Sequence, residues 1–300
     1  MNRITPLKLS IIFLNYNRLT ETRYTIAQIS RLLEDRNDVE IIAIDNGSTD
    51  GTGKFLQTQK DWVNVISLPH NTGIAGYNVG FKQAKGDYLL VLDDDSHPVD
   101  NITLDRIIQC LDTRPDVGVV ACRIESLKGE QIYTWHLPKN DEPGKSMAFV
   151  GCGFAIRRTL FEKIGWYPAD FFLYQNEMEV AIRVMRLGYK IVYDPSCRVI
   201  HRQSTIGRTN WRRVYYPTRN TIWLIRRYFP FPFAAYLIGS RLFFGLIRAI
   251  QSLEFGWYYR AVCDALYTPI EPQILPLTLR QDLTTFWRQN SIFHKIIGRL

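Results

Sequence analysis

Over the first 125 residues, short β-branched runs alternate with amphipathic stretches. This alternation is typical of βαβ units, in which helices join parallel strands. We therefore expect an α/β domain with a mainly parallel, Rossmann-like sheet that is flanked by helices. The expected strands are Leu9–Leu14, Glu40–Asp45, Val63–Leu68, Tyr88–Asp93 and Val117–Cys122, and the expected helices are Thr20–Leu33, Asn78–Ala84 and Ile102–Leu111.

A second block, residues 149–202, predicts further elements of the same domain. The expected elements are a strand over Phe149–Arg157, a helix near Thr159–Ile164, a helix near Asn176–Leu187 and a strand over Lys190–Tyr193. Beyond residue 202 the composition becomes basic and aromatic. We thus expect an α/β domain over residues 1–205, with halves at 1–125 and 126–205, and a helical region over 206–300.

Polar residues cluster directly after three of the expected strands. They are Asn15-Tyr16-Asn17, the run from Asp45 to Asp50, and Asp93-Asp94-Asp95. In open α/β sheets, ligands bind in the crevice at these carboxyl ends. No GxGxxG motif follows the first strand, so a dinucleotide-binding domain lacks its main support.

Three consecutive aspartates, Asp93-Asp94-Asp95, close an apolar strand. Burying adjacent carboxylates without partners is strongly unfavourable, whereas a divalent cation compensates their charge. Mg²⁺ and Mn²⁺ prefer carboxylate oxygens and can neutralise the charge of a diphosphate leaving group. The alternative is a solvated turn, or a helix N-cap in which Asp95 and Ser96 cap a helix that follows Pro98.

Glu177 lies near the start of the helix expected over Asn176–Leu187. Because a helix advances about 100° per residue, Ala181 and Val184 fall within about 40° of Glu177, which places this acid on the inward face. The same geometry places Glu179 on a solvated face. An inward carboxylate is a candidate general base. The alternative is that Glu177 only stabilises the helix N-terminus through the macrodipole.

His201 follows the last expected strand of the α/β domain and precedes Arg202. A lone histidine is more often structural than a metal ligand. Neutral imidazole is nevertheless a competent ligand for Mn²⁺, so His201 could complete a cation site or face a diphosphate.

The five cysteines form no CxxC pair and show no metal-finger spacing, which favours reduced thiols in a cytosolic setting. The N-terminus also lacks the pattern of a secretory signal. The formal net charge of +8 is uneven, since residues 201–300 carry 14 Lys/Arg against 4 Asp/Glu. The basic excess therefore belongs to the C-terminal third.

Taken in order, these motifs resemble family 2 of the inverting nucleotide-sugar glycosyltransferases, which have the GT-A fold, and especially rhamnosyltransferase-like members of bacterial polysaccharide pathways. The resemblance covers about residues 8–202. Each motif alone is weak, but their order along the chain is specific. The motifs are Ile11–Arg18, Ile44–Gly51, Asn71–Gly80, Leu92–Asp95, Gly151–Arg158, and Phe171–Tyr174 followed by Glu177.

The resemblance implies a nucleotide-binding half over residues 1–125 and an acceptor-side half over 126–205. Asp45 would accept from the N3–H of a pyrimidine base, which favours UDP or dTDP as the carrier. Asp93 and Asp95 match the DxD motif, and together with His201 they would hold Mg²⁺ or Mn²⁺. The residues implied in nucleotide-sugar binding are Asn15, Asn17, Asp45, Asn46, Ser48, Gly73, Gly76, Asn78, Asp93 and Asp94.

The resemblance also places the catalytic base at Glu177. The family's usual Glu-Asp pair before the catalytic helix is here Asn176-Glu177, so the base is one methylene longer than usual. Glu177 would deprotonate an acceptor hydroxyl, which would displace the nucleoside diphosphate with inversion. The implied acceptor is a glycan, or a lipid-linked glycan in cell-surface polysaccharide synthesis.

The stretch Phe229–Ile250 is nearly apolar but contains Arg241 and Arg248. An arginine near the middle of a spanning helix costs roughly 2.5–3.5 kcal/mol, so insertion in the plane of the membrane fits better. We therefore expect a peripheral protein on the cytoplasmic face of the cell membrane. The alternative is a helix that packs on the α/β domain or in a homodimer interface.

Two other classes of protein compete with this interpretation. A metal-dependent sugar nucleotidyltransferase would also use aspartate clusters, but it should carry a Gly-rich, basic triphosphate loop after the first strand, which Asn15–Arg18 is not. A non-catalytic glycan- or nucleic-acid-binding protein would account for the basic, aromatic C-terminal third. We expect no nucleic-acid partner.

Overall fold

The computed structural model describes residues 6–138, 140–204 and 209–289 and divides them into two compact units. One unit comprises residues 6–170 and 180–204. The other comprises residues 171–179 together with 209–289. The expected boundary between residues 205 and 206 lies outside the described residues. The short segment 171–179, which carries Glu177, thus groups with the C-terminal helices, although it is remote from them in sequence.

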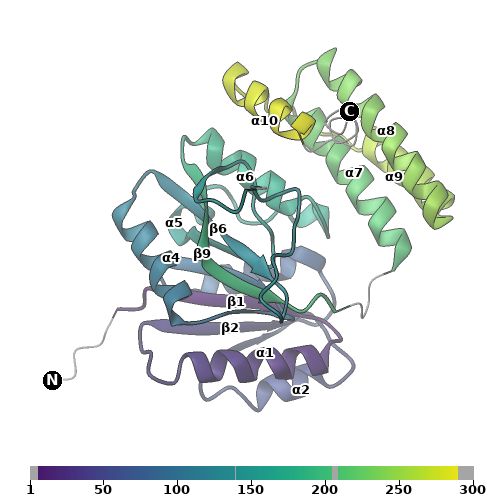
Figure 1. Cartoon of the computed structure of the whole chain (residues 1–300). Coiled ribbons are helices and arrows are strands. Elements are labelled where there is room, and N and C mark those ends of the chain that lie inside the picture. The colour runs from purple at the N-terminus through teal and green to yellow at the C-terminus, as the bar shows by residue number, and fades with distance from the viewer. Residues whose placement is uncertain (1–5, 139, 205–208, 290–300) are drawn as a thin grey trace. The chain divides into compact units, whose positions relative to one another are not determined.

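In the described part of the chain, nine strands form one sheet in the order β3-β2-β1-β4-β8-β6-β9-β5, and β7 pairs with β9 (Figure 1). The strands are β1 (Leu9–Asn15), β2 (Val39–Asp45), β3 (Asn64–Ser67), β4 (Tyr88–Asp93), β5 (Ser96–Pro98), β6 (Val117–Glu125), β7 (Gly144–Ser146), β8 (Gly153–Arg157) and β9 (Lys190–His201).

The first four long strands are parallel, as the alternation of strands and helices predicted. β1 pairs in parallel with β2 and β4, and β2 pairs in parallel with β3. Nearly every residue of β1 and β4 is buried, because a central parallel strand is covered on both faces. The register places Asn15 beside Asp45 and Leu14 beside Asp93, so these strands end at the same edge of the sheet.

The rest of the sheet is mixed. β8 is antiparallel to both β4 and β6, whereas β6 and β9 are parallel. The expected strand Lys190–Tyr193 continues to His201, because a register shift opposite residues 122 and 123 accommodates Pro195 instead of ending the strand. The expected strand over Phe149–Arg157 begins only at Gly153, since Gly153 N donates to Val150 O in a preceding turn.

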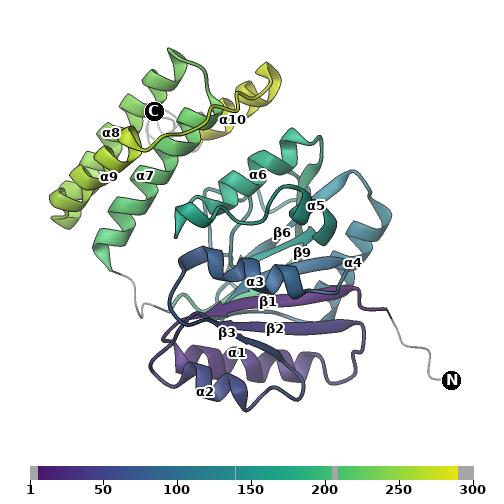
Figure 2. The same cartoon turned by 180° about the vertical axis from the view of Figure 1, so that it is seen from behind.

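Helices flank this sheet, with α3 on one face and α4 on the opposite face (Figures 1 and 2). The helices that begin in this unit are α1 (Leu19–Leu32), α2 (Thr52–Gln57), the 3₁₀ helix Gly73–Gly76, α3 (Tyr77–Gln83), α4 (Asn101–Thr113), α5 (Arg158–Lys163) and the 3₁₀ turn Ala169–Phe171. Helix α6 (Asn176–Arg186) belongs to both units, since its first turn groups with the C-terminal helices and the rest with the sheet.

The C-terminal helices are built around α7. The helices are α7 (Asn210–Tyr228), α8 (Phe233–Ser252), α9 (Phe255–Tyr267) and α10 (Leu277–Gln289). α7 packs against both α8 and α9, and most of its second half is buried. Among the described residues, α8 is the one helix that is long and apolar enough to cross a membrane by length and composition, and only 17% of its apolar window is buried.

Candidate active site

The expected site begins where β1, β2 and β4 end side by side. Asn15 and Asp45 are register partners at the last positions of their strands, and Asp93 closes β4 next to them. Parallel strands in register bring residues that are distant in sequence to one edge. The structure therefore brings together the three polar clusters that follow the first, second and fourth strands.

The aspartate run leaves β4 through a tight turn. Ser96 Oγ accepts from Asp93 N at 2.8 Å and lies 3.0 Å from the Cys152 carbonyl oxygen, to which it can donate. The alternative in which Asp95 and Ser96 cap a helix is wrong, because Ser96 begins strand β5. Asp100 caps α4 instead, by accepting from Thr103 N at 2.8 Å.

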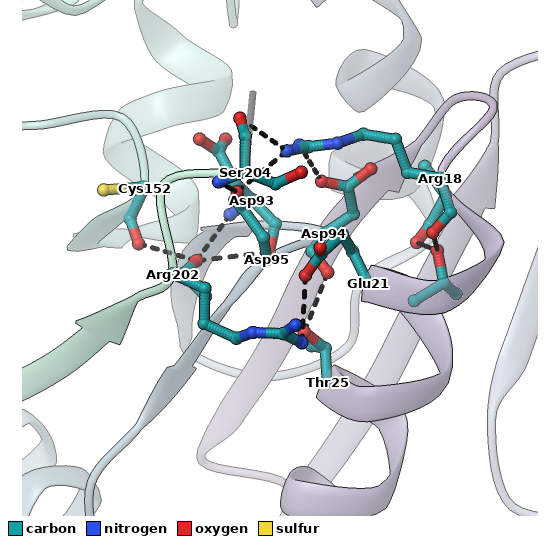
Figure 3. A network of polar contacts seen from close by, with 12 residues as sticks. Arg18, Glu21, Thr25, Asp93, Asp94, Asp95, Cys152, Arg202 and Ser204 are labelled. Atoms are coloured by element: carbon teal, nitrogen blue, oxygen red, sulfur yellow. Dashed lines mark hydrogen bonds and ion pairs between the residues drawn. The ribbon is translucent and has the colours of Figure 1, made fainter. Parts of the chain in front are cut away.

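Arg18 forms ion pairs with both Asp94 and Asp95 (Figure 3). Its guanidinium donates to Asp94 Oδ1 at 2.5 Å, to Asp95 Oδ2 at 2.9 Å and to Ser204 O at 3.2 Å. Asp94 and Asp95 are buried, so their adjacent charges need this cation. Burial raises the pKa of Asp94 well above its usual range, and the pairing with Arg18 acts against that rise.

Asp95 meets His201 at the centre of the site. The pairing of β5 with β9 aligns Ser96 with His201, which brings His201 Nε2 to 3.2 Å from Asp95 Oδ1. Both atoms are buried, and neither makes a hydrogen bond with any other described residue. Asp95 Oδ2, in contrast, accepts from Ser204 N at 2.9 Å in addition to Arg18. One oxygen of Asp95 is thus held in place while the other faces the imidazole.

Asp93 and Cys152 complete this group of potential ligands. The ligand atoms of Asp93, Cys152 and His201 lie within 4.8 Å of one another, and Cys152 Sγ is 3.5 Å from His201 Nδ1. Burial lowers the pKa of His201, but Cys152 and the neighbouring carboxylates outweigh it and raise the pKa to about 11. His201 Nε2 and Asp95 Oδ1 are close enough to form an ion pair when the imidazole is protonated. Carboxylate oxygen and imidazole nitrogen suit Mn²⁺, so these residues fit a divalent cation.

Arg202 fixes the end of β9 beside the aspartates, as Figure 3 shows. Its backbone N donates to Asp95 O at 3.0 Å, and its guanidinium pairs with Glu21 Oε2 at 2.9 Å. The same guanidinium lies 4.0 Å from the centre of the Tyr24 ring on α1. Arg18, Glu21 and Arg202 could not be assigned to the site from the sequence, because nothing in their local sequence indicates these long-range ion pairs.

Asp45 ends β2 and leads into a loop that is hydrogen-bonded to the loop after β1. Asp45 Oδ1 accepts from Ser48 N at 3.0 Å, and Ser48 Oγ accepts from Asn17 N at 3.0 Å. Asn17, which has a φ of 52°, accepts from Thr49 N at 2.7 Å through Oδ1. A Cβ on Gly53 would lie 2.2 Å from Asp45 Oδ2, so only glycine fits there without displacing the carboxylate.

The asparagines of the expected nucleotide site bond mainly to the protein itself. Asn15 donates to Ile44 O at 3.1 Å, and its Oδ1 accepts from Thr22 Oγ1 at 2.9 Å. Asn78 donates to Tyr167 O and accepts from Tyr167 N, at 3.0 and 3.1 Å. These side chains fix the shape of the strand end and of the start of α3.

Asn46 organises the glycine-rich turn in the same way. Its amide donates to Asn71 Oδ1 and to Gly73 O, and its Oδ1 accepts from Thr72 N at 3.0 Å. A Cβ on Gly76 would lie 2.8 Å from a Leu14 methyl group and 3.0 Å from Asn46 Oδ1. Gly73 has a φ of 62°, which favours glycine. Asn46 therefore holds the turn at Gly73, and the absence of a side chain at Gly76 lets the turn lie close to Leu14 of β1 and to Asn46.

Glu177 lies in the first turn of α6, within the second unit, and is partly exposed. The placement of Glu179 on a solvated face is wrong, because Glu179 is fully buried and accepts from Arg227 Nη1 at 2.7 Å and Tyr228 OH at 2.8 Å. The helix is buried on several sides, from Met178 to Ile182, so one inward face does not describe it.

This architecture, a mixed sheet with polar strand ends and an aspartate cluster beside β4, defines a GT-A-type α/β fold. Residues 10–177 match the family model of Glycosyl transferase family 2. The chain therefore belongs to glycosyltransferase family 2.

Named relatives agree with this family. The chain is 24% identical over 226 residues to the probable glycosyltransferase YdaM of Bacillus subtilis, covering 69% of this chain and 53% of YdaM. It is 24% identical over 191 residues to the O-antigen chain rhamnosyltransferase WbaN of Salmonella anatum, covering 59% of this chain and 60% of WbaN. The chain thus spans about half the length of YdaM.

Solved structures share the fold. The mannosyltransferase PcManGT of Pyrobaculum calidifontis, in complex with GDP-Man and Mn²⁺, matches with a TM-score of 0.59 at 18% identity, covering 98% of this chain and 85% of its own. Residues 1–349 of TarS from S. aureus, in complex with UDP-GlcNAc, match with a TM-score of 0.60 at 15% identity, covering 86% of this chain and 80% of their own.

Proposed function

We propose that this chain transfers a sugar from a nucleoside-diphosphate sugar to an acceptor hydroxyl, with inversion at the anomeric carbon. The observation that carries the proposal is the meeting of Asp95, His201 and Asp93 beside the end of β4 in a family 2 chain. These are the donor atoms that a divalent cation needs, at the edge of the sheet where α/β proteins bind ligands.

Asp95, His201 and Asp93 would hold Mg²⁺ or Mn²⁺. When bound, such a cation neutralises the charge on the departing diphosphate. Arg18 holds the second carboxylate oxygen of Asp95 and thereby fixes the orientation of the first. The structural neighbour PcManGT, which was solved in complex with GDP-Man and Mn²⁺, supports a divalent cation but does not distinguish between the two metals.

On the nucleotide side, Asp45 would accept from the N3–H of a pyrimidine, which favours UDP or dTDP. The loop contacts with Ser48 and the lack of space at Gly53 hold the Asp45 carboxylate in one orientation. Preorganised acceptors bind more tightly because little freedom is lost on binding. One structural neighbour was solved with GDP-Man and another with UDP-GlcNAc. The preference of this chain for a pyrimidine or a purine nucleotide must therefore be measured directly.

On the acceptor side, Glu177 would take the proton from the attacking hydroxyl. A carboxylate suffices as a base when it is positioned within hydrogen-bond reach of that proton. The alternative in which Glu177 acts only through the helix macrodipole predicts a different result. Under that alternative, Glu177→Gln would lower stability slightly and leave turnover nearly intact.

We further propose a lipid-linked glycan acceptor and peripheral contact with the cytoplasmic face of the membrane. On α8, one apolar stripe is exposed at helical spacing, and we call it the α8 face. It consists of Tyr236, Phe243, Leu246, Ile247 and Ile250, each between 37% and 67% exposed. An exposed apolar stripe of this kind suits insertion among lipid headgroups, where nearby exposed arginines can meet anionic lipids.

Arginines of the C-terminal unit contribute less to this surface than the sequence indicated. Arg219 is 9% exposed, and Arg226 donates to the carbonyls of Ala265 and Thr268 at the end of α9. Arg248 and Arg260 are exposed instead. Some arginines of this unit thus make internal hydrogen bonds, and only the others contribute positive charge to its surface. This distribution weakens the case for nucleic-acid binding.

The function is tested with purified protein in two steps. Labelled UDP, dTDP and GDP are titrated with and without Mn²⁺, and binding that requires the metal supports the proposal. Nucleotide sugars are then screened with an extract of lipid-pyrophosphate-linked acceptors. Glu177→Gln should retain metal-dependent binding and lose transfer, and near-wild-type turnover by this variant would show that the base is misassigned.

A further inference from the structure

The turn directly before α6 has an unusual backbone. Phe172, Tyr174 and Gln175 have φ angles of 59°, 65° and 64°, and none of them is glycine. The left-handed region is sterically disfavoured for residues with a Cβ. Such a conformation persists only where surrounding contacts hold it, and it is concentrated at functional sites. This turn leads into the helix turn that carries Glu177.

Asn220 of α7 supplies the contacts that hold this turn. The side chain is fully buried, and its Nδ2 lies 3.1 Å from Phe171 O, 2.8 Å from Leu173 O and 2.9 Å from Tyr174 O. Its Oδ1 accepts from Arg219 Nε at 2.9 Å, which fixes the orientation of the amide. The two N–H groups of this buried amide are thus shared among three carbonyls of residues 171–174, all within the second unit.

Arg219 makes an additional hydrogen bond to the same turn. Its Nη2 donates to Phe171 O at 2.9 Å, and its guanidinium lies 4.1 Å from the centre of the Trp223 ring. Tyr215 OH, 3.4 Å from Arg219 Nη1, in turn bonds to Asp264 of α9 at 2.5 Å. The turn is therefore connected, through Arg219 and Tyr215, to helices α7 and α9.

α7 also holds the chain on the other side of Glu177. Glu179, fully buried, accepts from Arg227 Nη1 at 2.7 Å and from Tyr228 OH at 2.8 Å. Hydrogen bonds to a buried charged group are strong and directional. The backbone is thus fixed both before and after the partly exposed Glu177.

We propose that Asn220 and Arg219 are positioning residues that set where the Glu177 carboxylate lies. The inference rests on the proposed function, in which Glu177 is the base. Proton transfer requires the base within hydrogen-bond reach of the attacking hydroxyl, so a small displacement of this turn lowers kcat. Nucleotide binding uses residues of the other unit and should not change.

The first test compares Asn220→Ala and Arg219→Lys with Arg213→Gln, an exposed arginine of the same helix as a control. We expect kcat to fall by about 100-fold in both test variants, with the KM for the donor unchanged, and to stay at the wild-type value in the control. Mn²⁺-dependent UDP binding reports that the other unit is intact. A wild-type kcat in both test variants would overturn the inference.

The second test needs no substrate. Amide hydrogen exchange should speed up over residues 171–179 in Asn220→Ala, while peptides from the sheet keep their wild-type rates. Unchanged exchange over 171–179 would show that Asn220 does not hold the turn. If Asn220→Ala fails to unfold cooperatively, Arg219→Lys serves in its place, with the same expectation and the same contrary result.

A double-mutant cycle separates this inference from the base assignment. If Asn220 acts through Glu177, Asn220→Ala should add no further loss in a Glu177→Gln background, measured from the residual rate at high enzyme concentration. An equal loss in both backgrounds would overturn the inference alone. Wild-type turnover in Glu177→Gln by itself would overturn the base assignment and, with it, this inference.

Discussion

His201 Nε2 lies 3.2 Å from Asp95 Oδ1, because His201 ends strand β9 and Asp95 directly precedes strand β5, whose three residues pair with the end of β9. Strand pairing and not local sequence creates this contact. Since Arg18 and Ser204 N occupy the other carboxylate oxygen, Asp95 has one oxygen directed at His201 and no freedom to turn it away. The Asp95 carboxylate is therefore held in an orientation that leaves Oδ1 facing His201.

Asp95→Asn should weaken Mn²⁺ binding in the presence of UDP by at least about 100-fold, because an amide is a poorer ligand than a carboxylate held by outer hydrogen bonds. Titration of free Mn²⁺ by electron paramagnetic resonance measures the affinity. Asp61→Asn, on an exposed aspartate, is the matched control and should bind as the wild type does. Equal affinity in both variants would remove Asp95 from the metal site.

Arg18→Gln should lower the free energy of unfolding by about 3–5 kcal/mol, because it leaves two buried carboxylates without their shared cation. Urea denaturation followed by tryptophan fluorescence measures this loss. Arg36→Gln is a matched control, since Arg36 is 13% exposed, close to the 16% of Arg18, but its partners Asp38 and Asp105 are 23% and 65% exposed, whereas Asp94 and Asp95 are 5% and 0% exposed. The control should lose only about 1 kcal/mol or less. Similar losses in the two variants would contradict a structural role for the Arg18 pairing.

The parallel half of the sheet could be predicted from the sequence because its signals are local. Each strand from β1 to β4 is an apolar or β-branched run that ends in polar residues, and the observed strands match the expected ranges within about two residues. The meeting of Asn15, Asp45 and Asp93 at one edge then follows from parallel register alone.

Other parts of the site have no local signal. Arg18 pairs with Asp94 and Asp95, which are more than 70 residues away in sequence. Strand β5 has only three residues, too few to show an alternation of polar and apolar positions. The angular position of Glu179 on its helix predicted a solvent-exposed side chain. That prediction was wrong because the position on the helix does not show that Arg227 of α7 packs against Glu179 and pairs with it. Long-range contacts decided these positions, and a single sequence does not encode them in any periodicity.

Gly53→Ala should weaken Mn²⁺-dependent UDP binding by about tenfold, equivalent to about 1.4 kcal/mol. The added Cβ would lie 2.2 Å from Asp45 Oδ2, so the carboxylate must move from the orientation that Ser48 N supports. Isothermal titration calorimetry measures the affinity. Gly144→Ala is the control, since nothing lies within 4 Å of a Cβ at that position. Wild-type affinity in Gly53→Ala would argue against nucleotide recognition by Asp45.

Ile247→Asp should abolish binding to vesicles that contain anionic lipid, because a carboxylate in the middle of the α8 face is repelled by the lipid headgroups and cannot enter the apolar layer. Cosedimentation with phosphatidylglycerol-containing vesicles measures binding at several salt concentrations. Thr285→Asp adds the same charge at an exposed position of α10 and should bind as the wild type does. If the wild-type protein forms a dimer that Ile247→Asp converts to monomer, and neither form binds vesicles, the α8 face is a subunit interface and the membrane proposal is wrong.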